Sequence, residues 1–243
     1  MFFIIPVYYV LLIYILAAVL PAAFLMRYVY RQDHVEKEPP VLLLQLIGYG
    51  VLAALLSGIL ELIGEKILNT AVNGKISQSS PTYHILLAFL VVAVIEEGMK
   101  FLLLYRRTWR DPNFNYRFDA VVYAVFTSLG FAAFENIKYV MGYGLTVAVP
   151  RALLAIPGHM SFAVFMGIFY GKAKLCSDMG DRTGKRLNIF LGYLIAVLMH
   201  GFYDACAMIG TTLSTVLFVV LVAVIYLVVF KVVKRQARHD EPI

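Results

Sequence analysis

The chain has 243 residues, of which 61% are hydrophobic and only 15% are charged, and its formal net charge is +6. Soluble domains are nearer half apolar and a quarter charged, so this composition excludes an ordinary soluble protein. Because the basic residues lie mainly in alternate connections between apolar runs, they indicate membrane topology rather than nucleic-acid binding. We therefore expect a multi-pass protein whose surroundings are the lipid bilayer, with no nucleic-acid partner.

Apolar runs of roughly 20 residues predict helices that cross the bilayer. Seven such runs occur, at about 4–26, 41–67, 83–105, 119–142, 148–174, 188–209 and 213–233. The expected fold is therefore all-α, a polytopic transmembrane helical bundle of about seven spanning helices. We expect it to form a single integral membrane domain over residues 1–243.

The distribution of lysine and arginine predicts how the bundle is oriented. Most of the 21 basic residues lie in segments 27–40, 106–118 and 172–186 and in the C-terminal tail. Since basic residues accumulate in cytoplasmic loops, we expect the N-terminus outside and the C-terminus in the cytoplasm.

Pro157 falls inside the fifth predicted helix. Proline lacks a backbone N–H and its ring clashes with the carbonyl one turn earlier. We therefore expect a kink there and a free backbone carbonyl near Leu153.

Ionisable side chains occur inside the third apolar run, where a charge is costly and is usually functional. Glu96 and Glu97 are adjacent, and Lys100 follows at helical spacing from both. Successive helical residues point about 100° apart. One glutamate can therefore face a cavity while the other pairs with Lys100.

Three later helices carry further polar residues, namely Glu135, His159 and the pair His200 and Asp204. His200 and Asp204 are four residues apart and share one helix face. A rise of about 1.5 Å per residue places all these groups about 7–20 Å below the outer helix ends. They could therefore meet in one cavity in the outer and middle part of the membrane.

This set of side chains suits hydrolysis. A buried carboxylate can act as a general base on water, and a histidine can stabilise an oxyanion or bind a metal ion. Structural roles compete with this interpretation: Lys100 could join helices through an ion pair, and Glu135 could serve hydrogen bonding. We expect Glu61 and Glu65 to be interfacial, with lining of the cavity as the alternative, and Asp119 to cap the fourth helix.

Several motifs resemble, in order, those of the PrsW family of intramembrane proteases, which are distantly related to the CAAX prenyl proteases and the CPBP-type glutamic intramembrane proteases. The stretches are Asp33 with Glu38-Pro39, Glu96-Glu97-x-x-Lys100, Asp119 to Tyr139, His159, and His200-Gly-Phe-Tyr-Asp204. The resemblance implies a multi-pass protease of a prokaryotic cell membrane. It further implies hydrolysis of a membrane-tethered protein or peptide on its extracytoplasmic side, as in the first cut of an anti-sigma factor.

The resemblance also implies roles for residues on the helices at about 83–209. Glu96 would activate water, and Lys100 would hold Glu97. His159 and His200 would stabilise the oxyanion or bind zinc, and Asp204 would orient His200. Glu135 stands where the CAAX proteases have a histidine, so its role stays open, as does the choice between a zinc enzyme and a glutamate mechanism without metal.

Two other functions remain open from the sequence. A transporter could use Glu96, Glu135 and His200 as a proton relay, although no matching halves are visible in the chain. A non-catalytic scaffold could bind transmembrane segments, but binding alone does not require the buried glutamate, histidine and aspartate side chains.

Overall fold

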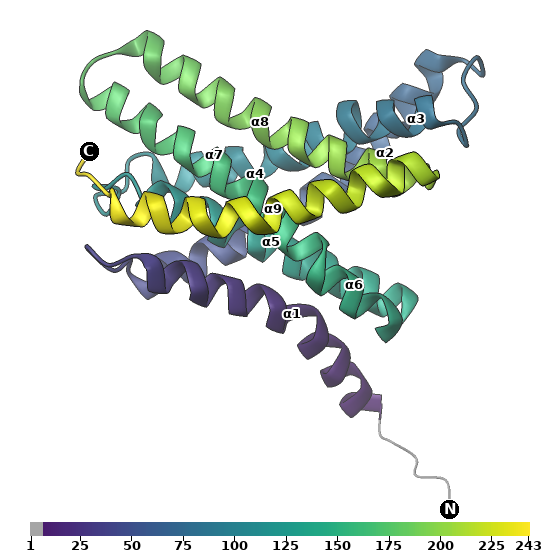
Figure 1. Cartoon of the computed structure of the whole chain (residues 1–243), viewed down its shortest axis with the longest axis horizontal. Helices are drawn as coiled ribbons and strands as arrows, with labels where there is room; N and C mark the ends of the chain where they lie inside the picture. Colours follow the sequence, from purple (N-terminus) through teal and green to yellow (C-terminus); the bar gives the residue numbers. More distant parts are fainter. Residues whose placement is uncertain (1–6) are drawn as a thin grey trace, which may run out of the picture.

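The computed structural model describes residues 7–243, which form a helical bundle (Figure 1). The all-α prediction is confirmed. The elements are α1 (Val7–Gln32), α2 (Pro40–Val72), α3 (Pro81–Leu86), η1 (Leu87–Ala93), α4 (Val94–Thr108), α5 (Asp119–Tyr143), η2 (Leu145–Val147), α6 (Ala148–Leu153), α7 (Ala155–Asp178), α8 (Arg182–Ile209) and α9 (Thr212–Arg238).

Six helical stretches in the described part of the chain are long and apolar enough to cross a membrane. The remaining expected span, 83–105, is present as three consecutive pieces, α3, the π-helical η1 and α4. The expected count of about seven is therefore confirmed. The first expected span begins at residues 4–6, which lie outside the described residues.

Several helices extend beyond their apolar runs. The expected span 188–209 begins six residues earlier, at Arg182, because Asp181 caps the helix by accepting a hydrogen bond from the backbone N–H of Gly184. In the same way Thr211 caps α9 through the N–H of Ser214. Hydropathy marks where a helix crosses lipid, whereas polar caps set where it begins.

The irregularity expected near Pro157 is present, as a break in the helix rather than a kink within it. Helix α6 ends at Leu153 and α7 begins at Ala155, two residues before the proline. The hydroxyl of Tyr226 on α9 donates a hydrogen bond to the carbonyl of Leu153. The carbonyl freed by the break is thus satisfied by a neighbouring helix, as membrane burial requires.

Helix α5 forms the centre of the bundle. In its most apolar stretch 83% of the residues are buried, against 17% for α9. Helix α5 packs against α1, α2 and α7. It approaches α2 closely at two glycines, because a Cβ on Gly130 would lie 2.5 Å from the carbonyl oxygen of Ile47, and one on Gly50 would lie 2.0 Å from that of Thr127. The backbones of α2 and α5 are therefore in direct contact at these glycines.

The start of α5 differs from the expectation that Asp119 caps the helix. Phe118 is the N-cap residue, and Asp119 is the first helical residue. The Asp119 carboxylate instead accepts the backbone N–H groups of Asn115 and Tyr116 at 3.1 and 2.7 Å. It therefore shapes the loop before the helix rather than the first turn.

The start of α1 and the C-terminus lie at opposite ends of the bundle (Figure 1). This arrangement agrees with an odd number of spans. Which end faces the cytoplasm stays a prediction from the basic residues.

Candidate active site

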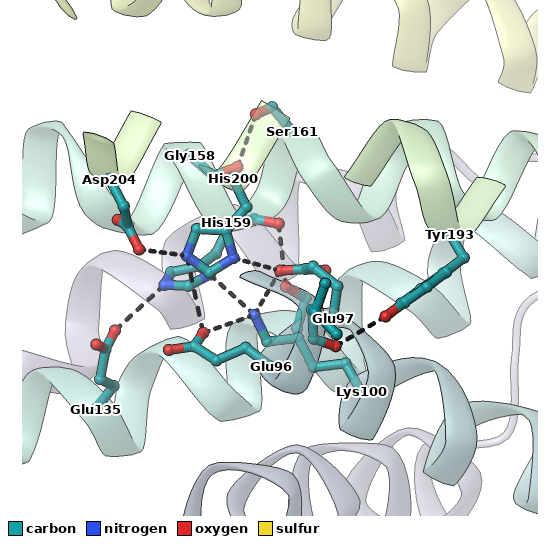
Figure 2. Close-up of polar contacts among 12 residues, drawn as sticks. Glu96, Glu97, Lys100, Glu135, Gly158, His159, Ser161, Tyr193, His200 and Asp204 are labelled. Atoms are coloured by element: carbon teal, nitrogen blue, oxygen red, sulfur yellow. Dashed lines mark hydrogen bonds and ion pairs between the residues drawn. The ribbon is translucent and has the colours of Figure 1, made fainter. Parts of the chain in front are cut away.

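The six predicted site residues and Lys100 come together from four helical elements (Figure 2). Helix α4 supplies Glu96, Glu97 and Lys100, and the others come from α5, α7 and α8. The remaining members are Glu135, His159, His200 and Asp204.

The π-helical segment η1 ends three residues before Glu96. A π-helix holds more residues per turn than an α-helix, and such segments are frequent at functional sites. The carboxylates of both Glu96 and Glu97 point into the bundle, where the residues are 5% and 1% exposed. Neither charge faces lipid, although the two residues are adjacent in sequence.

Lys100 lies at the middle of the cluster. Its Nζ is 3.2 Å from Glu96 Oε2, 2.8 Å from Glu97 Oε1 and 3.2 Å from His159 Nδ1. The face of the Phe131 ring is 4.0 Å from the same nitrogen. The ammonium is thus surrounded by two carboxylates, an imidazole and an aromatic face, all of which stabilise a buried positive charge.

The hydrogen bonds of His159 define its tautomer. An ammonium group can only donate, so Nδ1 of His159 must accept from Lys100. The proton of a neutral ring is then on Nε2, which is 3.2 Å from Glu135 Oε2. His159 therefore links Lys100 to Glu135 in a fixed orientation.

His200 is surrounded by carboxylates. Its Nδ1 is 2.8 Å from Glu97 Oε1, and its Nε2 is 3.3 Å from Asp204 Oδ2 and 3.9 Å from Glu96 Oε2. Ionised carboxylates only accept, so both ring nitrogens donate. The Phe162 ring stacks on the imidazole at 5.0 Å between centroids.

A cavity of about 690 Å³ opens beside this cluster. Five of the predicted site residues line it, namely Glu96, Glu135, His159, His200 and Asp204. Glu97 and Lys100 lie behind these five residues and do not line the cavity. The adjacent glutamates thus occupy different places, as the helical geometry allowed.

Of the two glutamates expected at the interface, Glu61 lines the cavity. Glu65 on α2 instead lies 3.4 Å from the hydroxyl of Tyr83 on α3. For Glu61 the alternative of lining the cavity is therefore the one found, and the interfacial role of Glu65 stays a prediction.

Sequence reasoning missed two residues of the site. Arg151 donates to Glu135 Oε2 at 2.7 Å from Nη2 and to Asn136 Oδ1 at 2.6 Å from Nε. An arginine inside an apolar run was a signal that could have identified it, because such a charge requires a partner. Asn136 carries no charge and gave no comparable signal.

Comparison with known proteins agrees with this geometry. A family model described as PrsW family intramembrane metalloprotease matches residues 38–231. The chain is 31% identical over 198 residues to Protease PrsW of Clostridioides difficile (strain 630), which covers 80% of this chain and 79% of that protein. It is 32% identical over 188 residues to Protease PrsW of Geobacillus kaustophilus (strain HTA426), covering 77% and 76% of the two chains.

Protease PrsW of Bacillus subtilis (strain 168) is 29% identical over 188 residues, which covers 77% of this chain and 79% of that protein. No solved structure matches the chain. The resemblance seen in the motifs is confirmed, and the relatives support the protease interpretation rather than the transporter. With its candidate spans, this chain is a multi-pass bacterial membrane protein and belongs to the PrsW family of intramembrane proteases.

Proposed function

We propose that this protease hydrolyses a peptide bond of a membrane-tethered protein with water activated by Glu96. The observation that carries the proposal is the position of Glu96. Its carboxylate lines the cavity together with both histidines, whereas Glu97 lies behind it. A general base must reach water in the substrate cavity, and of the two glutamates Glu96 does so.

In this mechanism Glu96 takes a proton from a water molecule in the cavity while the water oxygen attacks the peptide carbonyl carbon. The protonated Glu96 then gives the proton to the leaving amine. The ammonium of Lys100, 3.2 Å from Glu96 Oε2, pairs with this carboxylate and holds it in place.

His200 is best placed to stabilise the oxyanion. Its Nε2–H lies on the cavity side, where its contacts to Asp204 and Glu96 are long, at 3.3 and 3.9 Å. An N–H held this loosely can turn to a developing negative charge, which is the interaction that lowers the barrier. Asp204 and Glu97 orient the ring from its two nitrogens.

The family is described as metalloproteases. Four side chains offer ligand atoms within 4.8 Å of one another, namely Glu96, Glu97, His159 and His200. However, the ammonium of Lys100 lies among them, 2.8–3.2 Å from three of the four. Zinc binds such atoms at about 2.0–2.2 Å, so the ion and the ammonium would compete for one position. The arrangement does not fit a bound metal ion, and no step is assigned to one.

The position of the cavity supports the proposed substrate class. Arg151, Tyr143 and Met208 line it near the end of the bundle that the basic residues predict to be outside. A substrate with one transmembrane helix and an outer domain, of the anti-sigma-factor kind, could present its extracytoplasmic stretch there. The C-terminus would then face the cytoplasm.

The direct test replaces Glu96 by glutamine, which keeps the shape but cannot take up a proton. Cleavage should fall at least about 10²-fold, the usual contribution of a general base. Membrane proteins from cells with the wild-type and Glu96→Gln enzymes are compared for new N-termini in their outer segments. Equal amounts of the two inserted proteins serve as control, and identical N-termini would contradict the proposal.

A second test concerns the metal ion. Protein purified in detergent and dialysed against a strong chelator should keep its proteolytic activity, because Lys100 supplies the positive charge beside Glu96. Elemental analysis should find clearly less than one zinc ion per chain. One tightly bound zinc, with activity lost on its removal and regained on its return, would refute the glutamate mechanism without metal.

A further inference from the structure

Arg151 lies on the short helix α6, between the two helices that carry Glu135 and His159. Its guanidinium is held on three sides. Nη2 donates to Glu135, Nε donates to Asn136, and the Tyr139 ring lies 3.8 Å from the guanidinium carbon. A planar fork with two donors matches two acceptors in fixed directions, which an ammonium group cannot do.

A chain of polar contacts leads from Arg151 through Glu135 to His159 and Lys100. Glu135 Oε2 accepts from Arg151 and lies 3.2 Å from His159 Nε2, and Nδ1 of that ring accepts from Lys100. Two sides of His159 are therefore fixed, one by Lys100 and one by Glu135. Of these two partners Glu135 is the more exposed, since 18% of its side chain is accessible against 3% for Lys100.

Asn136 holds the other side of the arginine. Its amide oxygen accepts from Arg151 Nε, and its Nδ2 donates to the carbonyl of Ala18 on α1 at 3.1 Å. Asn136 is fully buried. The orientation of Arg151 is thus fixed by the backbone of a helix that does not line the cavity.

Charge balance gives Arg151 a further role. The cluster holds four carboxylates, those of Glu96, Glu97, Glu135 and Asp204. Lys100 and the doubly donating His200 supply two positive charges, and Arg151 supplies the third. Without it, Glu135 would lose a cation that it contacts directly in a region of low dielectric constant, and it would compete for Lys100.

We infer that Arg151 is a positioning residue of this protease, which acts on the reaction by fixing Glu135 and, through it, His159. The inference rests on the proposed function, because it assigns a role within the same site. Among the described residues no hydrogen bond or ion pair joins Arg151 to Glu96, so we assign its effect to its contact with Glu135.

The kinetic test uses proteoliposomes and a substrate identified by its Glu96-dependent N-terminus. Arg151→Met should lower kcat about 10–100-fold, as lost orientation of a site residue does, and should change KM less than about 2-fold. Arg151→Lys should recover part of kcat. Arg106→Met, which removes an exposed guanidinium elsewhere on the bundle, should leave both constants unchanged.

A double-mutant cycle tests the route of the effect. If Arg151 acts through Glu135, adding Arg151→Met to Glu135→Gln should lower kcat by less than about 2-fold more. Full multiplication of the two single effects would overturn the inference, as would wild-type kcat in Arg151→Met. In both cases an inactive Glu96→Gln enzyme would leave the proposed function standing.

A spectroscopic test needs no substrate. The ¹⁵N spectrum of histidine-labelled protein in nanodiscs, with His159 assigned by its replacement with glutamine, should show a proton on Nε2 and none on Nδ1. In Arg151→Met this signature should change while the unfolding temperature stays within a few degrees. An unaltered His159 signal in a folded Arg151→Met protein would overturn the inference even if no substrate were known.

Discussion

Glu38 is buried at the end of the bundle away from Arg151, in the connection between α1 and α2. It is 3% exposed and accepts a hydrogen bond from the Tyr123 hydroxyl at 2.7 Å. Burial raises the pKa of Glu38 to about 9, and the nearby Asp119 carboxylate adds to the rise. Burial likewise raises the pKa of Asp33 to about 6, and its carboxylate oxygens have no hydrogen-bond partner among the described residues.

These raised pKa values predict how stability depends on pH. An unfolded glutamate has a pKa near 4.3, so between about pH 4 and 9 the folded state binds more protons than the unfolded state. The free energy of unfolding should therefore fall as pH rises, by at most about 1.4 kcal/mol per pH unit from Glu38. Glu38→Gln should flatten this decline in thermal unfolding between pH 6 and 9, whereas the exposed neighbour change Glu36→Gln should not. A decline of unchanged slope in Glu38→Gln would contradict the assignment.

Individual charged residues in the apolar runs were predictable from the sequence. Glu96, His159 and Asp204 could be identified because a charge or imidazole at membrane depth is costly. The hydrogen-bond partners of these residues were harder to predict from the sequence. Asn136 contacts Arg151 and Ala18, which lie on two other helices, and helical spacing cannot predict a contact between helices.

At the scale of helices, the contact of α2 with α5 depends on glycine. A Cβ on Gly130 would lie 2.5 Å from the carbonyl oxygen and 2.8 Å from the Cα of Ile47, all of them backbone atoms that cannot turn aside. Gly130→Ala should therefore force the helices apart and destabilise the protein by about 1–3 kcal/mol, the usual range for overpacking. The measurement is thermal unfolding in detergent.

Gly48, which lies on the partner helix α2, provides the matched control. It is exposed, and a Cβ there would meet no atom within 4 Å. Gly48→Ala should leave stability unchanged or raise it by up to about 1 kcal/mol, because alanine favours the helix. Equal effects of the two substitutions would show that close packing at Gly130 is not needed.

The sequence predicted one irregularity of the helices and missed another. Pro157 has a known steric effect on the turn before it, so the break between α6 and α7 could be foreseen. The π-helix at Leu87–Ala93 could not, because its residues are ordinary apolar side chains that suit an α-helix equally well.

For the whole molecule, the sequence predicted the all-α bundle and the gathering of residues from distant helices. The rise per residue along helices of alternating direction predicted that these residues could meet, and the structure brings them together. The sequence could not show that Glu96 lines the cavity while Glu97 does not, since rotation about a helix axis depends on all neighbours together. Nor could it place Lys100 among the four potential metal ligands.

Two spans are interrupted, one by η1 before α4 and one at Leu154 between α6 and α7, and both interruptions lie beside the cavity. Val92 of η1 lines the cavity, and so do Arg151 and Ala155 on either side of the break at Leu154. Backbone that departs from the α-helix is tolerated at membrane depth only where protein or water, and not hydrocarbon, lies against it. The cavity therefore reaches both breaks, so water that enters it would meet backbone outside the α-helical pattern at two places inside the bundle.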